Sequence, residues 1–229
     1  MNPLLAIFAF LAALALATAS DTAPSYGDCP FGIHVIVARA SNEPPGAGIM
    51  GALANQILGG VPGSTMATLD YPAKFEPYIP SQTEGVVNLT KMIKKFAKNC
   101  PNTDIILMGY SQGAHVISDV LCGASENGFP TTKPLGTAIT NKISAILLMG
   151  DPSFLAGQPY NFGSSHGTGI FRREKPEGCK RVDRKMMSIC DAGDPFCEAG
   201  SDSLAVHMGY VATWGDVAVD FALAMVYSD

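Results

Sequence analysis

The sequence predicts an α/β fold with a doubly wound, mainly parallel sheet of five strands and helices on both faces. The first observation behind this prediction is that short apolar runs alternate along the chain with segments of helical periodicity. Such alternation is typical of a parallel sheet covered by helices. The second observation is that 229 residues, 47% of them hydrophobic, suffice for one compact domain with a sizeable core. We therefore expect no second domain.

The five expected strands are apolar nearly throughout, because both faces of a parallel sheet are covered. In chain order they lie at residues 32–40, 65–71, 105–108, 141–150 and 184–190. The segment "SNEPPGAG" follows the first strand and is predicted to be a loop, since it contains two prolines and two glycines. Residues 152–178 are Gly-rich and have little periodicity.

Four segments have the periodicity of helices: 49–58, 81–100, 112–122 and 214–228. The second of these opens with Ser81 and Glu84 at the spacing of a capping box, which predicts that the helix begins there. Its residues expected on one apolar face are Val87, Met92, Ile93 and Phe96.

The first 19 residues, "MNPLLAIFAFLAALALATA", are almost wholly apolar and end in small residues before a polar segment. This pattern predicts a secretory signal peptide cleaved near Ala19, which leaves a single domain at residues 20–229. An uncleaved anchor is the alternative, since no Lys or Arg precedes the apolar run. No later run is long enough to cross a bilayer. We expect a secreted, extracellular protein without stable membrane insertion.

Charge and cysteine content narrow the class of protein further. The formal net charge of −5 argues against a nucleic-acid partner, because phosphate backbones attract basic proteins. The six cysteines, all after the expected signal peptide, are Cys29, Cys100, Cys122, Cys179, Cys190 and Cys197. An even number in a secreted chain predicts three disulfides, and only Cys190 with Cys197 suggests a pair by proximity. A zinc site is the alternative, but the chain has no C-x-x-C pair, and we expect no metal.

The stretch "MGYSQGAH" places Ser111 where an expected strand turns into an expected helix. A sharp turn crowds the positions two before and two after its centre, which favours glycine there, and Gly109 and Gly113 occupy them. This is the G-x-S-x-G pattern of a nucleophile elbow, in which the N–H of Gln112 would face a developing oxyanion. The alternative is a helix start with Ser111 as its N-cap.

A serine nucleophile needs a histidine base, and the chain has four histidines. His34 is expected to pack in the core, and His115 follows Ser111 by one helical turn, from which its side chain cannot easily reach the hydroxyl proton. His166, in the segment "GSSHGTG", is a rival. We favour His207, because enzymes with this elbow have the chain order serine, acid, histidine.

The same chain order restricts the acid that orients the histidine. The candidates are Asp119, Asp151, Asp183, Asp191, Asp194 and Asp202. Asp119 is expected to face away from the serine, whereas Asp151 is a fair rival that could also simply form an Asp-Pro turn. Asp194 ranks first, because a disulfide between Cys190 and Cys197 would hold its loop in place.

Three motifs in this order resemble one family. Ser111 in "GYSQG", Asp194 in "CDAGDPFC" and His207 in "HMGY" resemble the cutinase and acetylxylan esterase family, carbohydrate esterase family 5, from about Cys29 to the end of the chain. Its members are small secreted serine esterases with an α/β-hydrolase core and no lid domain. The resemblance implies that these three residues form a catalytic triad.

The resemblance also implies an oxyanion hole and a disulfide pairing. The oxyanion donors would be Ser41, in "ARAS", together with the Gln112 N–H; the alternative for Ser41 is a polar residue that starts a loop. The implied pairs are Cys29 with Cys100, Cys122 with Cys179, and Cys190 with Cys197.

The resemblance leaves the substrate open between two branches. The pair matching Cys122 and Cys179 and the segment "MGDPSFLAGQPYNFG" resemble the acetylxylan esterase branch, whereas "ASNEPPGAG" resembles cutinase-like relatives as much. We expect deacetylation of acetylated xylan, with hydrolysis of cutin and fatty-acid esters as the alternative. Candidates to line an acyl slot are Phe75, Tyr78, Ile79, Phe154, Leu155, Phe171, Leu204 and Val206, of which over half are expected simply to pack.

Other expectations concern partners and modification. The expected reaction needs no cofactor, and a monomer is expected. Asn88 opens the sequon "NLT" and is a predicted glycosylation site. Two further hypotheses are a non-catalytic secreted protein that binds wall polymer and an enzyme that transfers acyl groups to an alcohol.

Overall fold

The centre of the molecule is one six-stranded sheet in a computed structural model that describes residues 29–228. The expected signal peptide, residues 1–19, lies outside the described residues. The strands are β1 (His34–Ala38), β2 (Thr65–Thr68), β3 (Ile105–Tyr110), β4 (Ile143–Met149), β5 (Asn161–Phe162) and β6 (Met186–Ile189). Their order is β2-β1-β3-β4-β6-β5, and every neighbouring pair is parallel.

The expected number of five strands is wrong, because β5 adds a sixth at the edge of the sheet. It pairs with β6 and is extended by hydrogen bonds from Ser188 N to Tyr160 O (3.0 Å) and from Cys190 N to Phe162 O (2.9 Å). A strand of two residues has no alternation to recognise. Its pairing is therefore decided by the neighbouring strand and not by a local pattern.

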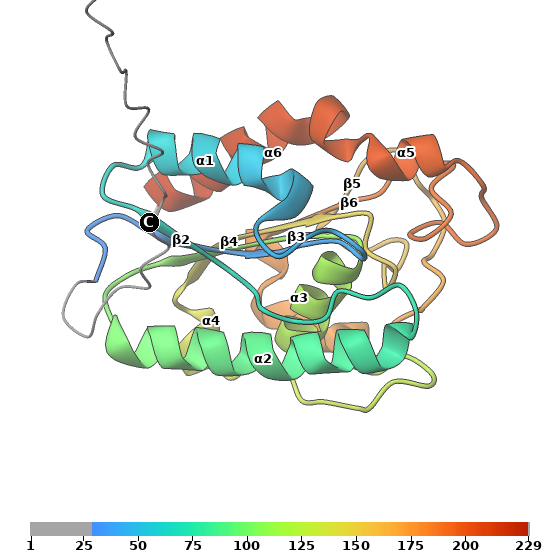
Figure 1. Cartoon of the computed structure of the whole chain (residues 1–229), viewed down its shortest axis with the longest axis horizontal. Coiled ribbons are helices and arrows are strands. Elements are labelled where there is room, and N and C mark those ends of the chain that lie inside the picture. Colours follow the sequence, from blue (N-terminus) through green and yellow to red (C-terminus); the bar gives the residue numbers. More distant parts are fainter. Residues whose placement is uncertain (1–28, 229) are drawn as a thin grey trace, which may run out of the picture.

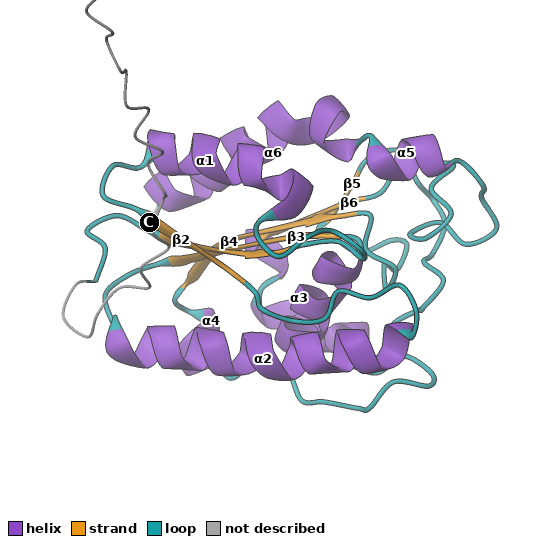
Figure 2. Cartoon of the chain, viewed as in Figure 1, coloured by secondary structure: helices purple, strands orange, loops and turns teal. Residues whose placement is uncertain are grey.

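Helices cover both faces of the sheet, as the alternating pattern predicts (Figure 1). One face carries α1 (Gly51–Gly60) and α6 (Tyr210–Tyr227), and the other carries α2 (Tyr78–Asn99), α3 (Gln112–Cys122) and α4 (Thr137–Thr140) (Figure 2). The short helix α5 (Leu204–Met208) precedes α6, and three 3₁₀ turns lie at Gly48–Met50, Pro176–Arg181 and Asp183–Lys185. Within residues 29–228, none of the helices is both long and apolar enough to cross a membrane.

The core consists of two apolar layers, one on each side of the sheet. Alternate residues of β3 enter different layers: Ile105 and Leu107 pack towards α2 and α3, whereas Ile106 and Met108 pack towards α1 and α6. All six residues of β3 are buried. The strand that leads to Ser111 is therefore held on both faces.

Helix α2 begins at Tyr78, three residues before the start that the capping-box pattern predicts. The capping box is wrong because the Ser81 hydroxyl has tertiary partners: it accepts from Lys74 N (2.8 Å) and donates to Gln112 Oε1 (3.0 Å). The expected apolar face is also wrong at Val87, which is 45% exposed; the buried apolar positions are Val86, Leu89, Ile93 and Ala97, with Met92 and Phe96 partly buried against them.

All six cysteines form disulfides, in the pairing that the resemblance implies. The pairs are Cys29–Cys100, Cys122–Cys179 and Cys190–Cys197. The first attaches the segment before β1 to the end of α2, and the second attaches the end of α3 to the 3₁₀ turn before β6. The third closes the loop that follows β6. Each cross-link restricts the unfolded chain and thereby favours the folded state.

Candidate active site

Ser111 occupies the turn between β3 and α3 in a conformation that side chains rarely adopt. Its φ is 52° and its ψ is −118°, a backbone strain that proteins retain mainly at functional sites. A Cβ at Gly109 would lie 2.6 Å from Gly113 O, and one at Gly113 would collide with the carbonyl of Ala38. The prediction that both positions need glycine is confirmed.

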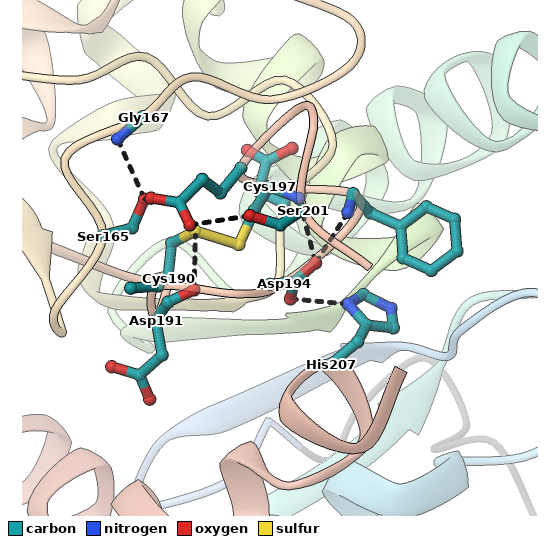
Figure 3. Close-up of a disulfide and its surroundings, with 12 residues drawn as sticks. Ser165, Gly167, Cys190, Asp191, Asp194, Cys197, Ser201 and His207 are labelled. Atoms are coloured by element: carbon teal, nitrogen blue, oxygen red, sulfur yellow. Dashed lines mark hydrogen bonds and ion pairs between the residues drawn. A yellow bond between two sulfur atoms is a disulfide. The ribbon is translucent and has the colours of Figure 1, made fainter. Parts of the chain in front are cut away.

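His207 and Asp194 are brought together by two segments that follow β6. His207 lies on α5, and Asp194 lies in the disulfide-closed loop before it (Figure 3). His207 Nδ1 is 2.7 Å from Asp194 Oδ2, and both residues are buried. The other carboxylate oxygen accepts from Phe196 N (2.7 Å) and Cys197 N (3.1 Å). These contacts orient the carboxylate towards the imidazole.

The charge state of Asp194 follows from its hydrogen bonds. Burial alone raises the pKa of this carboxyl, but the hydrogen bond and positive charge of His207 outweigh burial, aided by donors from Tyr210 and Phe196. The pKa of Asp194 therefore lies below its usual value, and the carboxylate is ionised at neutral pH.

A cavity of about 220 Å³ opens beside these residues. Ser41 and Ser111 line it, together with the apolar residues Phe75, Tyr78, Pro152, Ile170, Phe171 and Phe196. The ring of Phe196 lies 4.5 Å from the His207 ring, centroid to centroid. The cavity thus connects the elbow serine with a wall that contacts the histidine.

Ser41 supplies an unused hydroxyl at this cavity. Its Oγ is buried and has no hydrogen-bond partner among residues 29–228. The loop that carries it is fixed by the carboxylate of Glu43, which accepts from Ala40 N and Ile49 N, both at 2.7 Å. A buried polar atom without a hydrogen-bond partner is costly in a folded protein. The Ser41 hydroxyl is therefore available to donate a hydrogen bond to a ligand in the cavity.

Gln112 contributes in two ways, of which the sequence suggested only one. Its backbone N–H is the first of α3, so no carbonyl within the helix can accept from it. Its buried side chain donates from Nε2 to Lys74 O (2.9 Å) and accepts from the Ser81 hydroxyl. These bonds attach the elbow to the loop that carries the cavity residue Phe75.

The other three histidines have different surroundings. His34 is buried in β1, with Nδ1 2.8 Å from Thr65 Oγ1 and its ring stacked on Phe96, which confirms the expectation of a packed core residue. His115 is fully buried within α3. His166 is exposed in a loop, and no hydrogen bond or ion pair among the described residues links it to Ser111 or Asp194.

The rival acids also have other partners. Asp151 accepts from the N–H and hydroxyl of Ser153, both at 2.8 Å, which is the turn-forming role. Asp191 binds Ser164 and the indole of Trp214. Asp119 does not face solvent: it is fully buried and forms an ion pair with a second buried residue, Arg173 (2.7 Å).

Three residues next to His207 and Asp194 lie within the quoted motifs, but the sequence assigned them no role. Tyr110 donates from its hydroxyl to His207 O, and Tyr210 donates to Asp194 Oδ2 at 2.7 Å. A Cβ at Gly150, where φ is +62°, would lie 2.8 Å from His207 Cε1, so only glycine leaves room for the ring. The available signals were Tyr110 within "GYSQG", Tyr210 within "HMGY" and the glycine that ends "LLMG".

One group of side chains has the composition of a metal site. The ligand atoms of His115, Asp119 and Glu126 lie within 4.8 Å of one another. However, the guanidinium of Arg173 is 2.7 Å from Asp119 Oδ1 and 3.0 Å from Glu126 Oε1. It already supplies the positive charge that these carboxylates need, and a metal ion would have to displace it. The group is therefore an internal ion-pair network.

A parallel sheet covered on both faces, with a serine at a strand-to-helix elbow, defines an α/β-hydrolase-like protein. The sequence model described as "Cutinase" matches residues 29–226, and the chain belongs to the cutinase family. This family membership and the relatives below make it a carboxylic ester hydrolase.

Individual relatives carry two kinds of names. Cutinase 11 from Verticillium dahliae is 35% identical over 87% of this chain and 70% of its own length. Acetylxylan esterase 2 from Talaromyces purpureogenus is 34% identical over 84% of this chain and 86% of its own length. A solved structure of an acetylxylan esterase matches with a TM-score of 0.81 and 32% identity, over 87% of this chain and 100% of that chain.

Proposed function

We propose that the protein is a serine esterase that deacetylates acetylated xylan through a triad of Ser111, His207 and Asp194. The observation that carries the proposal is the 2.7 Å contact between His207 and Asp194 beside a cavity that Ser111 lines. An ionised, buried carboxylate holds the imidazole by Nδ1. The other ring nitrogen, Nε2, is then the one available as a base.

The proposed mechanism is acyl transfer in two steps. His207 Nε2 takes the proton of the Ser111 hydroxyl as the oxygen attacks the ester carbonyl. The Gln112 N–H and the Ser41 hydroxyl donate to the negative oxygen of the tetrahedral intermediate. His207 then protonates the leaving alcohol, and an acyl-serine remains. Water enters by the same route, with His207 as its base, and releases the acid.

Acetylated xylan is supported as the substrate by likeness to proteins that carry that name. Two solved acetylxylan esterase structures match with TM-scores of 0.81 and 0.79 and at 31–32% identity. A solved cutinase, from Trichoderma reesei, has a TM-score of 0.62. The backbone thus resembles these two acetylxylan esterases more than it resembles this cutinase.

A second candidate function is hydrolysis of longer acyl esters, as in cutin. The cavity volume favours it, because apolar cavities of roughly 150 Å³ already accommodate a benzene molecule, and this one is about 220 Å³. Its lining is mostly aromatic and aliphatic. Phe75 and Ile170 are also 51% and 44% exposed at its edge, where they could contact an acyl chain or a polymer surface.

The setting of the enzyme is part of the proposal. The named fungal relatives, the three disulfides and the apolar first 19 residues support secretion of a single mature domain. Glycosylation at Asn88 and a monomeric state stay predictions. Asn88 lies within α2, and its side-chain amide donates to Asp70 O at 3.1 Å.

The test is hydrolysis of a p-nitrophenyl ester series from acetyl to dodecanoyl, together with acetate release from acetylated xylan. Ser111→Ala is the test variant. Ser228→Ala is the control, because that serine is exposed at the end of α6. Acetyl preference with Ser111-dependent acetate release supports the proposal, and activity that rises with chain length supports the second candidate. Equal activity in Ser111→Ala would contradict both.

A further inference from the structure

The carboxylate of Asp194 accepts four hydrogen bonds, and the mechanism uses only one of them. Oδ1 accepts from the backbone of Phe196 and Cys197. Oδ2 accepts from His207 Nδ1 and from the hydroxyl of Tyr210, both at 2.7 Å. Four donors fill the capacity of an ionised carboxylate. Tyr210 is the one side chain besides His207 that binds this carboxylate among residues 29–228.

Tyr210 reaches the carboxylate from a rigid position. It is the first residue of α6 and is fully buried. Its hydroxyl accepts from Asp191 N (3.0 Å) and lies 3.3 Å from Cys197 Sγ. Both of these atoms belong to the loop closed by the disulfide. The hydroxyl therefore contacts that loop at three places, its start, its acid and its end.

The direction of the hydrogen bond is determined by the protonation state of the phenol. Burial, followed by the nearby charge of Asp194, raises the pKa of Tyr210 far above its usual value. The phenol is therefore protonated at neutral pH, where Asp194 is ionised. With Asp191 N–H as a donor to the hydroxyl oxygen, the hydroxyl proton goes to Asp194.

We propose that Tyr210 is a positioning residue that acts on His207 through Asp194. Its hydroxyl holds the carboxylate in the plane that His207 requires and limits the negative charge that Oδ2 offers to the imidazole. The inference rests on the proposed function, since it assigns a role within the same triad. Tyr210 itself touches neither the substrate nor the reacting oxygen in this mechanism.

The two effects make separate predictions. A carboxylate oxygen that loses one donor binds its remaining donor more strongly. Without the Tyr210 hydroxyl, Asp194 stabilises the protonated imidazole more, and the base form of His207 appears only at higher pH. The acid limb of the pH–rate profile should then move upward. The looser carboxylate should also lower kcat.

Other polar groups near His207 and Asp194 do not bind the Asp194 carboxylate. Asp191, on the loop after β6, directs its carboxylate to Trp214 and Ser164. Tyr110, at the end of β3, donates to the backbone carbonyl of His207 and not to Asp194. Removing the Tyr110 hydroxyl should therefore lower kcat without moving the acid limb. This variant separates misplacement of the His207 ring from a change in the negative charge that Asp194 offers to it.

The experiment compares Tyr210→Phe with Tyr227→Phe in the full mature chain. Tyr227 is the matched control, because it lies at the other end of the same helix and donates to Gly60 O (2.7 Å). The readout is kcat/KM for p-nitrophenyl acetate between pH 4 and 9. In Tyr210→Phe we expect the acid limb of the pH–rate profile to move to higher pH by about half a unit. We also expect kcat to fall by about tenfold. Tyr227→Phe should match the parent protein.

A lower kcat or melting temperature in Tyr210→Phe with an unmoved acid limb would overturn the proposal, because a merely structural role predicts that result. If Tyr210→Phe fails to fold, 3-fluorotyrosine at position 210 replaces it. The fluorinated phenol is a stronger donor, so the acid limb should move to lower pH, and an unmoved limb would again overturn the proposal. Activity that persists in Ser111→Ala would instead contradict the proposed function.

Discussion

Two buried histidine–aspartate pairs lie close to the nucleophile elbow, and they differ in almost every neighbour. His207 Nδ1 is 2.7 Å from Asp194 Oδ2, whereas His115 Nε2 is 3.5 Å from Asp119 Oδ2. Asp194 has no arginine or lysine partner among the described residues. Asp119 forms an ion pair with Arg173 and accepts from Gln82 at 2.6 Å. Only Asp194 keeps its charge for a histidine.

The histidine rings differ in access as well. The His115 ring is enclosed by aromatic rings of Tyr78, Phe129 and Phe171. Burial lowers the pKa of His115 to about 4, so the ring is neutral. The His207 ring instead contacts Phe196, which lines the cavity beside Ser111. A histidine and an aspartate at close range thus provide a base only under two conditions. The histidine ring must lie next to a cavity, and no other cationic side chain may form an ion pair with the carboxylate.

The largest expected effect is on kcat, and it should distinguish the two histidines when each is replaced by asparagine. His207→Asn should lower kcat by about 10⁴-fold or more, because an amide can keep the bond to Asp194 but cannot take a proton. His115→Asn should leave kcat within about tenfold, since His115 is not in contact with the cavity in this mechanism. Steady-state kinetics on p-nitrophenyl acetate measures both. Equal losses in the two variants would contradict the comparison.

The two aspartates should separate activity from stability. Asp194→Asn should lower kcat by about 10⁴-fold, because the amide favours the wrong imidazole tautomer. Asp119→Asn should instead lower the free energy of unfolding by about 3 kcal/mol, since Arg173 then keeps only Glu126 as an anionic partner. Urea unfolding and kcat are measured for each variant. A stable Asp119→Asn protein with low kcat would assign Asp119 to catalysis.

Each region also contains a buried polar atom without a hydrogen-bond partner among residues 29–228, Ser41 Oγ or His115 Nε2. Only Ser41 lies at the cavity. Ser41→Ala should lower kcat by about 10²-fold with little change in KM, because the hydroxyl meets charge that exists only in the transition state. Ser41→Thr keeps a hydroxyl and should retain more activity than the alanine variant. A KM effect alone would place Ser41 in substrate binding.

The last expected effect is a pH dependence of stability, which involves no change in kcat. The folded pKa of His115 is about 4 and the ordinary value is 6.5, so between these values the unfolded chain binds a proton that the folded chain does not. Stability should fall as the pH falls through this window, by about 3 kcal/mol for this residue. His34, whose pKa burial also lowers to about 4, adds a loss of the same sign.

The matched measurement is the free energy of unfolding at pH 7 and pH 4.5 for the parent protein and His115→Asn. The asparagine side chain can keep a hydrogen bond with the Tyr78 hydroxyl, which lies 3.1 Å from His115 Nδ1. The variant should lose less stability between the two pH values. An identical loss would show that His115 titrates normally in the folded protein.

Much of the fold could be predicted because its signals are local. The apolar run of β3, the glycines on either side of Ser111 and the periodicity of α3 lie within 18 consecutive residues. Local signals failed where a tertiary partner decided the outcome. The pairing of β5 depends on β6, and the Ser81 hydroxyl binds Lys74 and Gln112 instead of capping its own helix.

The candidate site shows the same division between local and distant causes. The amino-acid sequence by itself determined the α/β class, the elbow serine and the chain order that ranks Asp194 and His207. The reason is that these depend on the periodicity of individual segments, on one five-residue motif and on the order of residues along the chain. Only the tertiary structure decided which histidine meets an unpaired carboxylate and why Gly150 leaves room for its ring. It also brought Tyr210 to the acid. These contacts join segments that only folding brings together, so no local pattern encodes them.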